Sequence, residues 1–460
     1  MSSNESENER YEMLVNGDIH KVIPWLAVPT IISMMVSAIY NMADTFFVSQ
    51  LGTSASGAVG IIFSAMAIIQ ALSFTIGMGS GNYMARCLGA GRHEDGERAV
   101  SVAFFTGFLL GTCLGVFCLF HIDQVVMLLG ATETIKPYAV EYARYIFLAT
   151  PFMMCSFIMN NLLRLQGLAA FAMVGITAGG ILNIALDPIF IFAFGMGVRG
   201  AALATILSQA VSAVWVLKFL TGSKTKWHLR REHLRPQAKG VLPALALGAS
   251  PFIMQSTESL ITVCFNSSLL KYGGDIAVGA MTVLSSIMQF AMMPLQGLTQ
   301  GAQPIISYNY GARNPGRVRR AFQVLLMACL AYSLLLWALV QLFPQLFALM
   351  FTSDSELVSY ASWALRIYMA ATGIFGIQIA CQQTFVALGN AKISLFLAVL
   401  RKIILLIPFI YILPNFFADK AFAVFLAEPV ADFLAVCTTA TMFAVHFKKS
   451  MTALEGKPGV

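Results

Sequence analysis

Charged residues are scarce in this chain of 460 amino acids, and their scarcity excludes an ordinary soluble fold. Asp, Glu, Lys and Arg make up 11% of the sequence, whereas apolar residues make up 58%. A typical globular domain carries about 25% charged residues. The apolar residues come in blocks of roughly twenty, the length that a helix needs to cross about 30 Å of hydrocarbon. The sequence therefore predicts an all-α polytopic membrane protein.

The chain also lacks the motifs that mark common catalytic and cofactor sites. It contains no GxxxxGKS or GxxxxGKT nucleotide loop, no HExxH zinc motif, no GxSxG elbow and no CxxC pair. Seven of its eight cysteines fall inside apolar blocks, which favours free buried thiols. The net charge of +7 is typical of loops that face an anionic leaflet, so it does not indicate a nucleic-acid partner. We therefore expect a protein that is not an enzyme and holds no cofactor.

Twelve apolar blocks predict twelve membrane-spanning helices. The blocks cover about residues 22–49, 58–85, 99–120, 139–162, 168–195, 197–220, 241–270, 276–306, 320–343, 359–387, 391–413 and 420–447. The third block contains Gly107, Gly111 and Gly115, whose GxxxG spacing predicts a helix-packing face.

The basic residues predict the orientation of these helices. Most of the 29 Lys and Arg lie in the two tails and in alternate joints, so both termini are expected in the cytoplasm of a bacterial plasma-membrane protein. The expected parts are a tail over 1–21, an N-lobe of six spans over 22–220, a basic linker over 221–240, a C-lobe of six spans over 241–447 and a tail over 448–460. Arg366 is the clearest basic residue predicted to lie deep in a span.

The sequence repeats itself at an offset of about 220 residues. Matched positions pair Pro29 with Pro251, the Ala-Val-Gly triplets at 58–60 and 277–279 with each other, and Pro188 with Pro408. Because each half holds an even number of spans, the two lobes are predicted to be parallel repeats around a central cavity.

Five of the 22 acids lie inside predicted spans: Asp44, Asp187, Glu258, Glu428 and Asp432. A carboxylate at the centre of a bilayer costs roughly 2.5–3.5 kcal/mol, so such residues usually face a bundle interior or a wet cavity. These five side chains are therefore candidates for binding an ion or a cationic substrate.

The candidates in the first half form a set of oxygen ligands. Asn183 and Asp187 lie one helical turn apart, Asp44 lies in the first span beyond the expected bend at Pro29, and Thr205 adds a hydroxyl. Carboxylate, amide and hydroxyl oxygens suit a proton or a hard cation. Two alternatives stay open, namely that Asp44 caps a span near the interface and that Asp187 makes a structural hydrogen bond.

The candidates in the second half are more mixed. Glu258 and Gln255 lie in a stretch that is polar for its depth, and either a substrate site or an internal structural pair would explain them. Glu428 and Asp432 share a helix face, and repulsion between them predicts that one is protonated or near the surface. Flexible side chains such as Met288 and Met292 adapt to many organic shapes, although packing against lipid or other helices is the commoner use of methionine.

The ordered combination of several segments resembles the multidrug and toxic compound extrusion transporters, in particular a bacterial branch that includes the staphylococcal multidrug exporter. The segments are Asn41-Met42-Ala43-Asp44-Thr45-Phe46-Phe47, Leu88-Gly89-Ala90-Gly91-Arg92, Arg164-Leu165-Gln166-Gly167, Asn183 to Asp187-Pro188, and Gly197-Val198-Arg199-Gly200-Ala201-Ala202-Leu203-Ala204-Thr205. The similarity extends over nearly all of residues 15–450.

The resemblance implies a secondary antiporter that exports amphipathic, mostly cationic organic molecules in exchange for inward H⁺ or Na⁺. It implies that Asp44, Asn183, Asp187 and Thr205 bind the coupling cation, as a metal site if that cation is Na⁺, and that Pro29 bends the first span. Glu258 resembles a coupling acid of another branch, whose partner acid is replaced here by Gln378. We expect a monomer that contacts lipids and organic small molecules. The alternatives are a flippase for lipid-linked saccharides, which would need several basic residues in its cavity, and a receptor or scaffold without transport.

Overall fold

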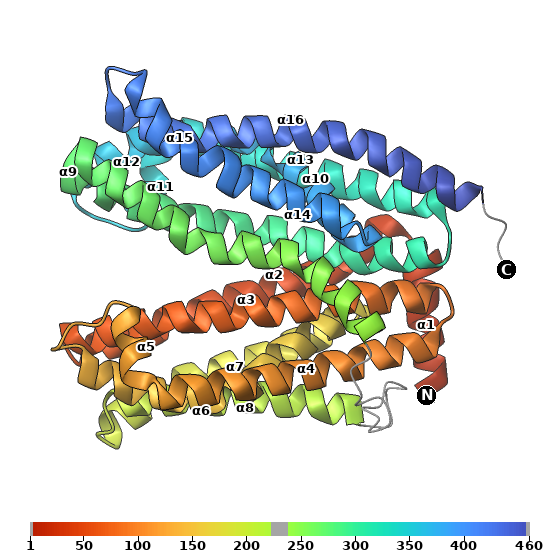
Figure 1. Cartoon of the computed structure of the whole chain (residues 1–460), viewed down its shortest axis with the longest axis horizontal. Coiled ribbons are helices and arrows are strands. Elements are labelled where there is room, and N and C mark those ends of the chain that lie inside the picture. The colour runs from red at the N-terminus through yellow and green to blue at the C-terminus, as the bar shows by residue number, and fades with distance from the viewer. Residues whose placement is uncertain (1–2, 222–237, 457–460) are drawn as a thin grey trace. The chain divides into compact units, whose positions relative to one another are not determined.

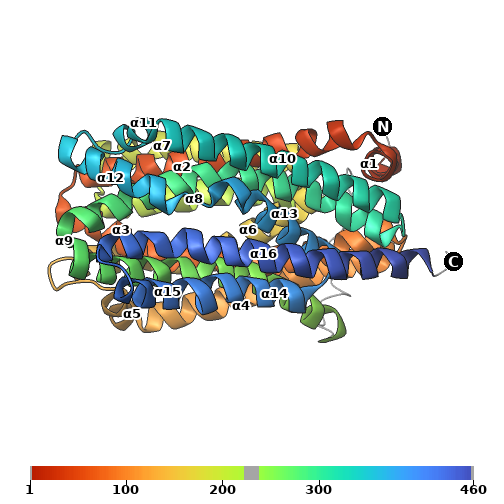
Figure 2. The same ribbon diagram turned by 90° about the horizontal axis from the view of Figure 1, so that it is seen from above.

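The computed structural model describes residues 3–221 and 238–456, which form helices joined by short turns (Figures 1 and 2). Most of the predicted linker over 221–240 lies outside the described residues. The first half of the chain contains α1 (Ser3–Asn16), α2 (Ile19–Ser49), α3 (Thr53–Gly89), α4 (His93–Phe120), α5 (Ile122–Leu128), α6 (Lys136–Leu165), α7 (Ala169–Pro188), the π-helical turn η1 (Ile189–Ala193) and α8 (Val198–Thr221).

The second half begins with one long element and ends with another. Its elements are α9 (Ala238–Gly311), α10 (Pro315–Leu342), α11 (Pro344–Leu349), α12 (Ser355–Tyr368), α13 (Thr372–Leu388), α14 (Ala391–Val399), the π-helical turn η3 (Leu400–Leu406), α15 (Ile407–Ile412), the 3₁₀ turn η4 (Leu413–Asn415) and α16 (Lys420–Glu455).

The helices supply twelve membrane spans, as the apolar blocks predict. Among the described residues, ten helices are long and apolar enough to cross a membrane, and α12 with α13, which meet at a bend of 53°, form one more span. The element α9 counts once among the ten but is two spans, because Gly274 leaves the helical conformation at φ 69° and ψ −164°. Glycine adopts this positive φ readily because it has no Cβ. Figure 1 shows the chain of α9 reversing its direction.

The chain divides into two compact units. We call the unit formed by Met1–Gly17 and Val28–Gly248 the N-lobe, and the unit formed by Asp18–Ala27 and Ala249–Val460 the C-lobe. The first turns of α2 therefore pack with the C-lobe, where the backbone of Ala27 lies against Gly301.

In the N-lobe, α6 packs against α3, α4 and α8 and is the most buried spanning helix. The predicted glycine face of α4 lies on this helix. A Cβ added at Gly111 would come within 2.8 Å of Pro151 Cα, and one at Gly115 within 2.5 Å of the Phe147 carbonyl oxygen. The interpretation of the GxxxG spacing as a packing face is confirmed, because only a hydrogen atom fits there.

In the C-lobe, α13 packs against α10, α14 and α16. Aromatic rings fill much of this interface, including Phe385, which meets Phe443 edge-on at a centroid distance of 5.1 Å. All eight cysteines are free, but the expectation that they are buried is wrong for Cys113 and Cys437, which face outward from their helices.

Candidate functional site

The four predicted ion-binding residues lie in the interior of the N-lobe. Asp44 is on α2, Asn183 and Asp187 are on α7, and Thr205 is on α8, with exposed fractions of 2%, 1%, 0% and 5%. Asp44 does not occupy a helix end, because α2 continues to Ser49.

Three helices bring the oxygen atoms of this N-lobe cluster together. Asn183 Nδ2 donates to Asp187 Oδ1 at 3.4 Å, as their spacing of one turn predicts. The carboxylate of Asp187 interacts electrostatically with that of Asp44, so the acids of α2 and α7 share one site. The Thr205 hydroxyl donates to Ala201 O of its own helix at 3.1 Å, which leaves its lone pairs for another group.

A break in helical geometry follows directly after Asp187. The residue Pro188 ends α7, and the chain continues as the π-helical turn η1. Proline lacks the N–H that an α-helix would use here, and short π-helical turns occur frequently at functional sites. The sequence therefore predicts the local irregularity beside Asp187, although not its form.

Two tyrosines belong to the N-lobe cluster and were not predicted from the sequence. The fully buried Tyr142 of α6 interacts electrostatically with both Asp44 and Asp187. The Tyr40 hydroxyl accepts a hydrogen bond from Gln209 Nε2 at 3.4 Å, and its ring lies one turn before Asp44 on α2. The sequence does show that both tyrosines lie inside predicted spans. Tyrosine also packs well in a span without a functional role, so their position alone did not indicate a site.

The cluster holds several buried oxygens that make no hydrogen bond. Within the described residues, Asn183 Oδ1 and Asp187 Oδ2 lack a partner, and Asp44 has no neighbour beyond the Tyr142 hydroxyl within hydrogen-bonding reach. No Lys, Arg or His of the described chain forms an ion pair with either carboxylate. Unpaired buried polar groups destabilise a fold, so native proteins usually satisfy them. The arrangement can satisfy these oxygens by binding a proton or a small cation.

This donor set differs from a transition-metal site. Over the residues that the structure describes, no three His, Cys, Asp or Glu side chains are grouped to hold a metal ion. Two carboxylates, an amide and hydroxyls are instead the hard oxygen ligands that suit Na⁺ or a proton.

The C-lobe contains a second buried cluster of charges, and here each acid has a basic partner. Arg401 Nε donates to Asp432 Oδ1 at 2.6 Å, and Arg401 Nη2 donates to Glu428 Oε1 at 3.0 Å. The neighbouring Lys402 donates to Glu258 Oε1 at 2.6 Å. The Arg401 guanidinium also lies 4.5 Å from the centre of the Phe375 ring, in a cation–π contact.

For Glu428 and Asp432 the surface alternative is wrong, since both side chains are buried, and the guanidinium of Arg401 between them offsets their repulsion. The clearest basic residue inside a span is not Arg366, whose side chain is exposed, but Arg401 together with Lys402. Both bases lie in η3, near the middle of the predicted span over 391–413.

The remaining candidates of the second half do not gather at one point. The carboxylate of Glu258 is 61% exposed although its partner Lys402 is buried, and Gln255 is exposed nearby on α9. The side chain of Gln378 is buried and donates to Gln382 at 3.4 Å. In the second span of α9, Met292 is buried and Met288 is half-buried.

The bend predicted at Pro29 stays a prediction. In the structure α2 runs as one helix from Ile19 to Ser49, and the carbonyl of Pro29 accepts a hydrogen bond from Ser33 Oγ at 2.8 Å. The chain passes from the C-lobe to the N-lobe just before this proline.

Twelve apolar spans in two lobes, with polar and charged side chains buried inside each lobe, are typical of a membrane transporter. Comparison with known proteins identifies the family. The MatE family model matches the chain twice, over residues 29–189 and 251–412. The chain belongs to the MatE family, and the two matches confirm the internal repeat.

Similar proteins cover the whole chain. The sequence is 25% identical over 452 residues to the multidrug export protein MepA of Staphylococcus aureus and 24% identical over 452 residues to that of Staphylococcus saprophyticus, with 98% of each chain covered. Among solved structures, a MATE in its bent conformation has a TM-score of 0.91 at 25% identity, covering 97% of this chain and 99% of that one. A MOP superfamily transporter from Pyrococcus furiosus has a TM-score of 0.88 at 26% identity, covering 97% and 98%.

Proposed function

We propose that this chain is a secondary antiporter that exports amphipathic, mostly cationic organic compounds in exchange for inward H⁺ or Na⁺. One observation carries the proposal: Asp44 and Asp187 are buried together in the N-lobe without a basic partner among the described residues. A site of this kind changes its net charge when it takes up or releases a cation. It is therefore suited to couple ion flow to a change in helix packing.

The contrast between the lobes supports assigning coupling to the N-lobe. In the C-lobe, Arg401 and Lys402 already balance most of the negative charge of three acids. A cation would have to displace one of these bases before it could bind. In the N-lobe the two carboxylates lack a counter-charge, and the coupling ion supplies it. The Asp44 and Asp187 carboxylates and the oxygens of Asn183 and Thr205 hold this ion.

The energy available depends on the charge of the substrate. One positive charge that moves inward across about 100 mV supplies roughly 2.3 kcal/mol, which concentrates a neutral compound roughly 50-fold. A monovalent cationic compound exchanged for one cation is driven by the ion gradient alone. The substrate class is suggested by the relatives, which are named multidrug export proteins, and by a chain that contains 24 methionines and 35 phenylalanines. Methionine and aromatic side chains adapt to varied apolar shapes and attract organic cations.

We place the transporter in the bacterial plasma membrane as a monomer surrounded by lipid, with lobes over about 22–220 and 241–447. Both termini would face the cytoplasm, because Lys and Arg are concentrated in the tails and in alternate joints. A flippase for lipid-linked saccharides is less well supported, since the two buried bases of the C-lobe are paired with acids instead of being available to a pyrophosphate.

Transport by the purified full chain in liposomes tests the proposal. We expect ethidium to move against its gradient when an opposing H⁺ or Na⁺ gradient is imposed, and to equilibrate passively when neither is present. Imposing each gradient separately identifies the ion. Equal dye movement with and without either ion gradient would refute antiport, and the absence of any dye movement in active vesicles would refute the substrate class.

A further inference from the structure

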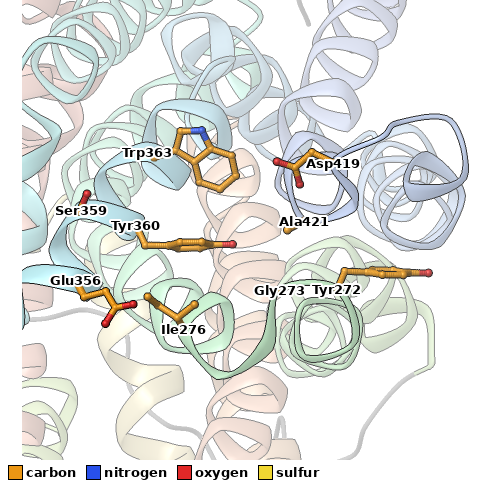
Figure 3. Close-up of a pocket in the computed structure, with 9 residues that line it drawn as sticks. All are labelled: Tyr272, Gly273, Ile276, Glu356, Ser359, Tyr360, Trp363, Asp419 and Ala421. Atoms are coloured by element: carbon orange, nitrogen blue, oxygen red, sulfur yellow. The ribbon is translucent and has the colours of Figure 1, made fainter.

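A cavity of 580 Å³ lies within the C-lobe, well separated along the chain from the N-lobe cluster. It is formed where α9 reverses at Gly274 and where α12 and α16 begin (Figure 3). This is the end of α16 opposite the C-terminus (Figure 1). Small-molecule sites typically enclose about 300–1,000 Å³, so the cavity is large enough for an organic ligand.

Two aromatic side chains provide flat apolar faces in this cavity. Tyr360 and Trp363, both on α12, meet edge-to-face at a centroid distance of 5.3 Å, and Figure 3 shows them beside the same space. Each ring also contacts the fully buried Phe425, at 6.4 Å and 6.1 Å. The rings are therefore held in position before any ligand arrives.

Two carboxylates give the cavity its negative charge. Asp419 caps α16 by accepting a hydrogen bond from Phe422 N through Oδ1 at 3.0 Å, which leaves its second oxygen for a ligand. Asp419 also interacts electrostatically with Tyr360 across the cavity. The carboxylate of Glu356, on the other side of the cavity in Figure 3, makes no ion pair within the described chain.

The basic residues nearby occupy a different face. The Nζ atoms of Lys271 and Lys420 lie 5.2 Å and 5.4 Å from the centre of the Tyr272 ring, at the edge of the cavity. The Tyr272 ring thus already makes cation–π contacts with two lysines. Among the described residues, no cation lies over the rings of Tyr360 and Trp363.

We propose that this cavity is a binding site for an organic cation with a substituted ammonium group. The ammonium lies against the ring faces of Tyr360 and Trp363, and Asp419 and Glu356 neutralise it. Aromatic faces bounded by carboxylates are the chemistry that recognises such cations, because the ring quadrupole and the full negative charges act together. With the C-terminus in the cytoplasm, the site lies at the external end of the C-lobe, where a transported cation arrives or departs.

Binding of choline to the purified full chain, measured by calorimetry, tests this site independently of transport. We expect choline to bind and its uncharged carbon analogue 3,3-dimethyl-1-butanol to bind at least tenfold more weakly. Tyr360→Leu should weaken choline binding roughly 3- to 30-fold, the range expected for one cation–π contact, while Tyr360→Phe keeps the ring and the affinity. The double variant Asp419→Asn with Glu356→Gln should weaken binding and remove its dependence on salt.

The variants are chosen to leave the fold intact and to locate the site. Asparagine caps helices about as well as aspartate, so Asp419→Asn removes charge without removing the cap. Trp363→Phe should retain choline binding in calorimetry but abolish any change in tryptophan fluorescence. Lys271→Gln should tighten binding by removing repulsion. Asp44→Asn should leave choline affinity unchanged, because the N-lobe cluster is a separate site.

The proposal is overturned if Tyr360→Leu and the double charge variant bind choline as tightly as the unmodified protein, or if the uncharged analogue binds equally well. It is also overturned if no choline binding is detected in a folded sample. These outcomes leave ion-coupled export untouched, just as a failure of antiport in liposomes leaves the binding measurement untouched.

Discussion

At the scale of single residues, the two lobes differ in how each treats a buried carboxylate. Asp44 and Asp187 have no basic partner among the described residues, whereas Glu428 and Asp432 both bind Arg401. An acid that already has a basic partner gains little from an incoming cation. We therefore expect reversible ion binding at the N-lobe cluster and a structural role for the C-lobe cluster.

Removing the hydroxyl of Tyr142 should affect both stability and coupling. The hydroxyl is fully buried within hydrogen-bonding reach of Asp44 and Thr205, so Tyr142→Phe should lower the free energy of unfolding by about 1–3 kcal/mol. The same change removes an oxygen from the proposed ion site and should weaken ion-driven transport. Thermal unfolding in detergent and transport in liposomes measure the two effects. A Phe variant that keeps full coupling would contradict this role.

Replacing Arg401 should destabilise the protein far more than replacing its neighbour. Arg401→Met leaves Glu428 and Asp432 buried without a counter-charge, which should cost about 3–5 kcal/mol. Lys402→Met leaves one acid, Glu258, without its partner instead of two, so the loss should be smaller. Equal losses of stability in Arg401→Met and Lys402→Met, measured by thermal unfolding, would show that the two buried acids do not cause the destabilisation of Arg401→Met.

A triple variant provides the matched control for Arg401. Converting Arg401, Glu428 and Asp432 together to apolar residues of similar size removes the whole ionic group, and it should restore most of the stability lost in Arg401→Met. If the triple variant is no more stable than the single one, lost packing rather than unpaired charge causes the effect.

At the scale of helices, sequence patterns predicted the elements well and the charge pairing poorly. Length and apolarity define the spans, and they are local properties that a sequence displays directly. Arg401 and Lys402 lie inside a predicted span, but their ion pairs with acids on α9 and α16 depend on contacts between helices that the sequence does not display. Tyr142 was missed because its role depends on contacts with residues on three other helices.

The packing of α4 on α6 gives a prediction at this scale. A methyl group at Gly115 would meet the Phe147 carbonyl oxygen at 2.5 Å, so Gly115→Ala should separate the helices and cost about 1–3 kcal/mol. Gly60 is also helical, but a methyl group there meets nothing within 4 Å, so Gly60→Ala should leave stability unchanged or raise it by up to about 1 kcal/mol. Thermal unfolding of both variants checks this. A neutral Gly115→Ala would mean that α4 and α6 pack less closely.

At the scale of the whole molecule, the duplicated family match shows that one six-span plan is used twice. The repeat was visible in matched prolines and glycines, because these residues determine where helices bend, end and approach one another. The buried polar residues of the two lobes differ, because the N-lobe has acids without a basic partner among the described residues and the C-lobe has ion pairs. The repeat therefore predicts the scaffold of each lobe and not its chemistry.

The most direct test of coupling by the N-lobe compares two transport assays in Asp44→Asn and Asp187→Asn. One assay measures substrate accumulation driven by an ion gradient, and the other measures substrate exchange without a gradient. An amide mimics the neutralised carboxylate, so both variants should exchange labelled for unlabelled ethidium but lose accumulation driven by the ion gradient at least tenfold. Asp123→Asn, which alters an exposed acid paired with Lys136, should behave like the unmodified protein. Full ion-driven accumulation in both Asp44→Asn and Asp187→Asn would contradict coupling by these acids.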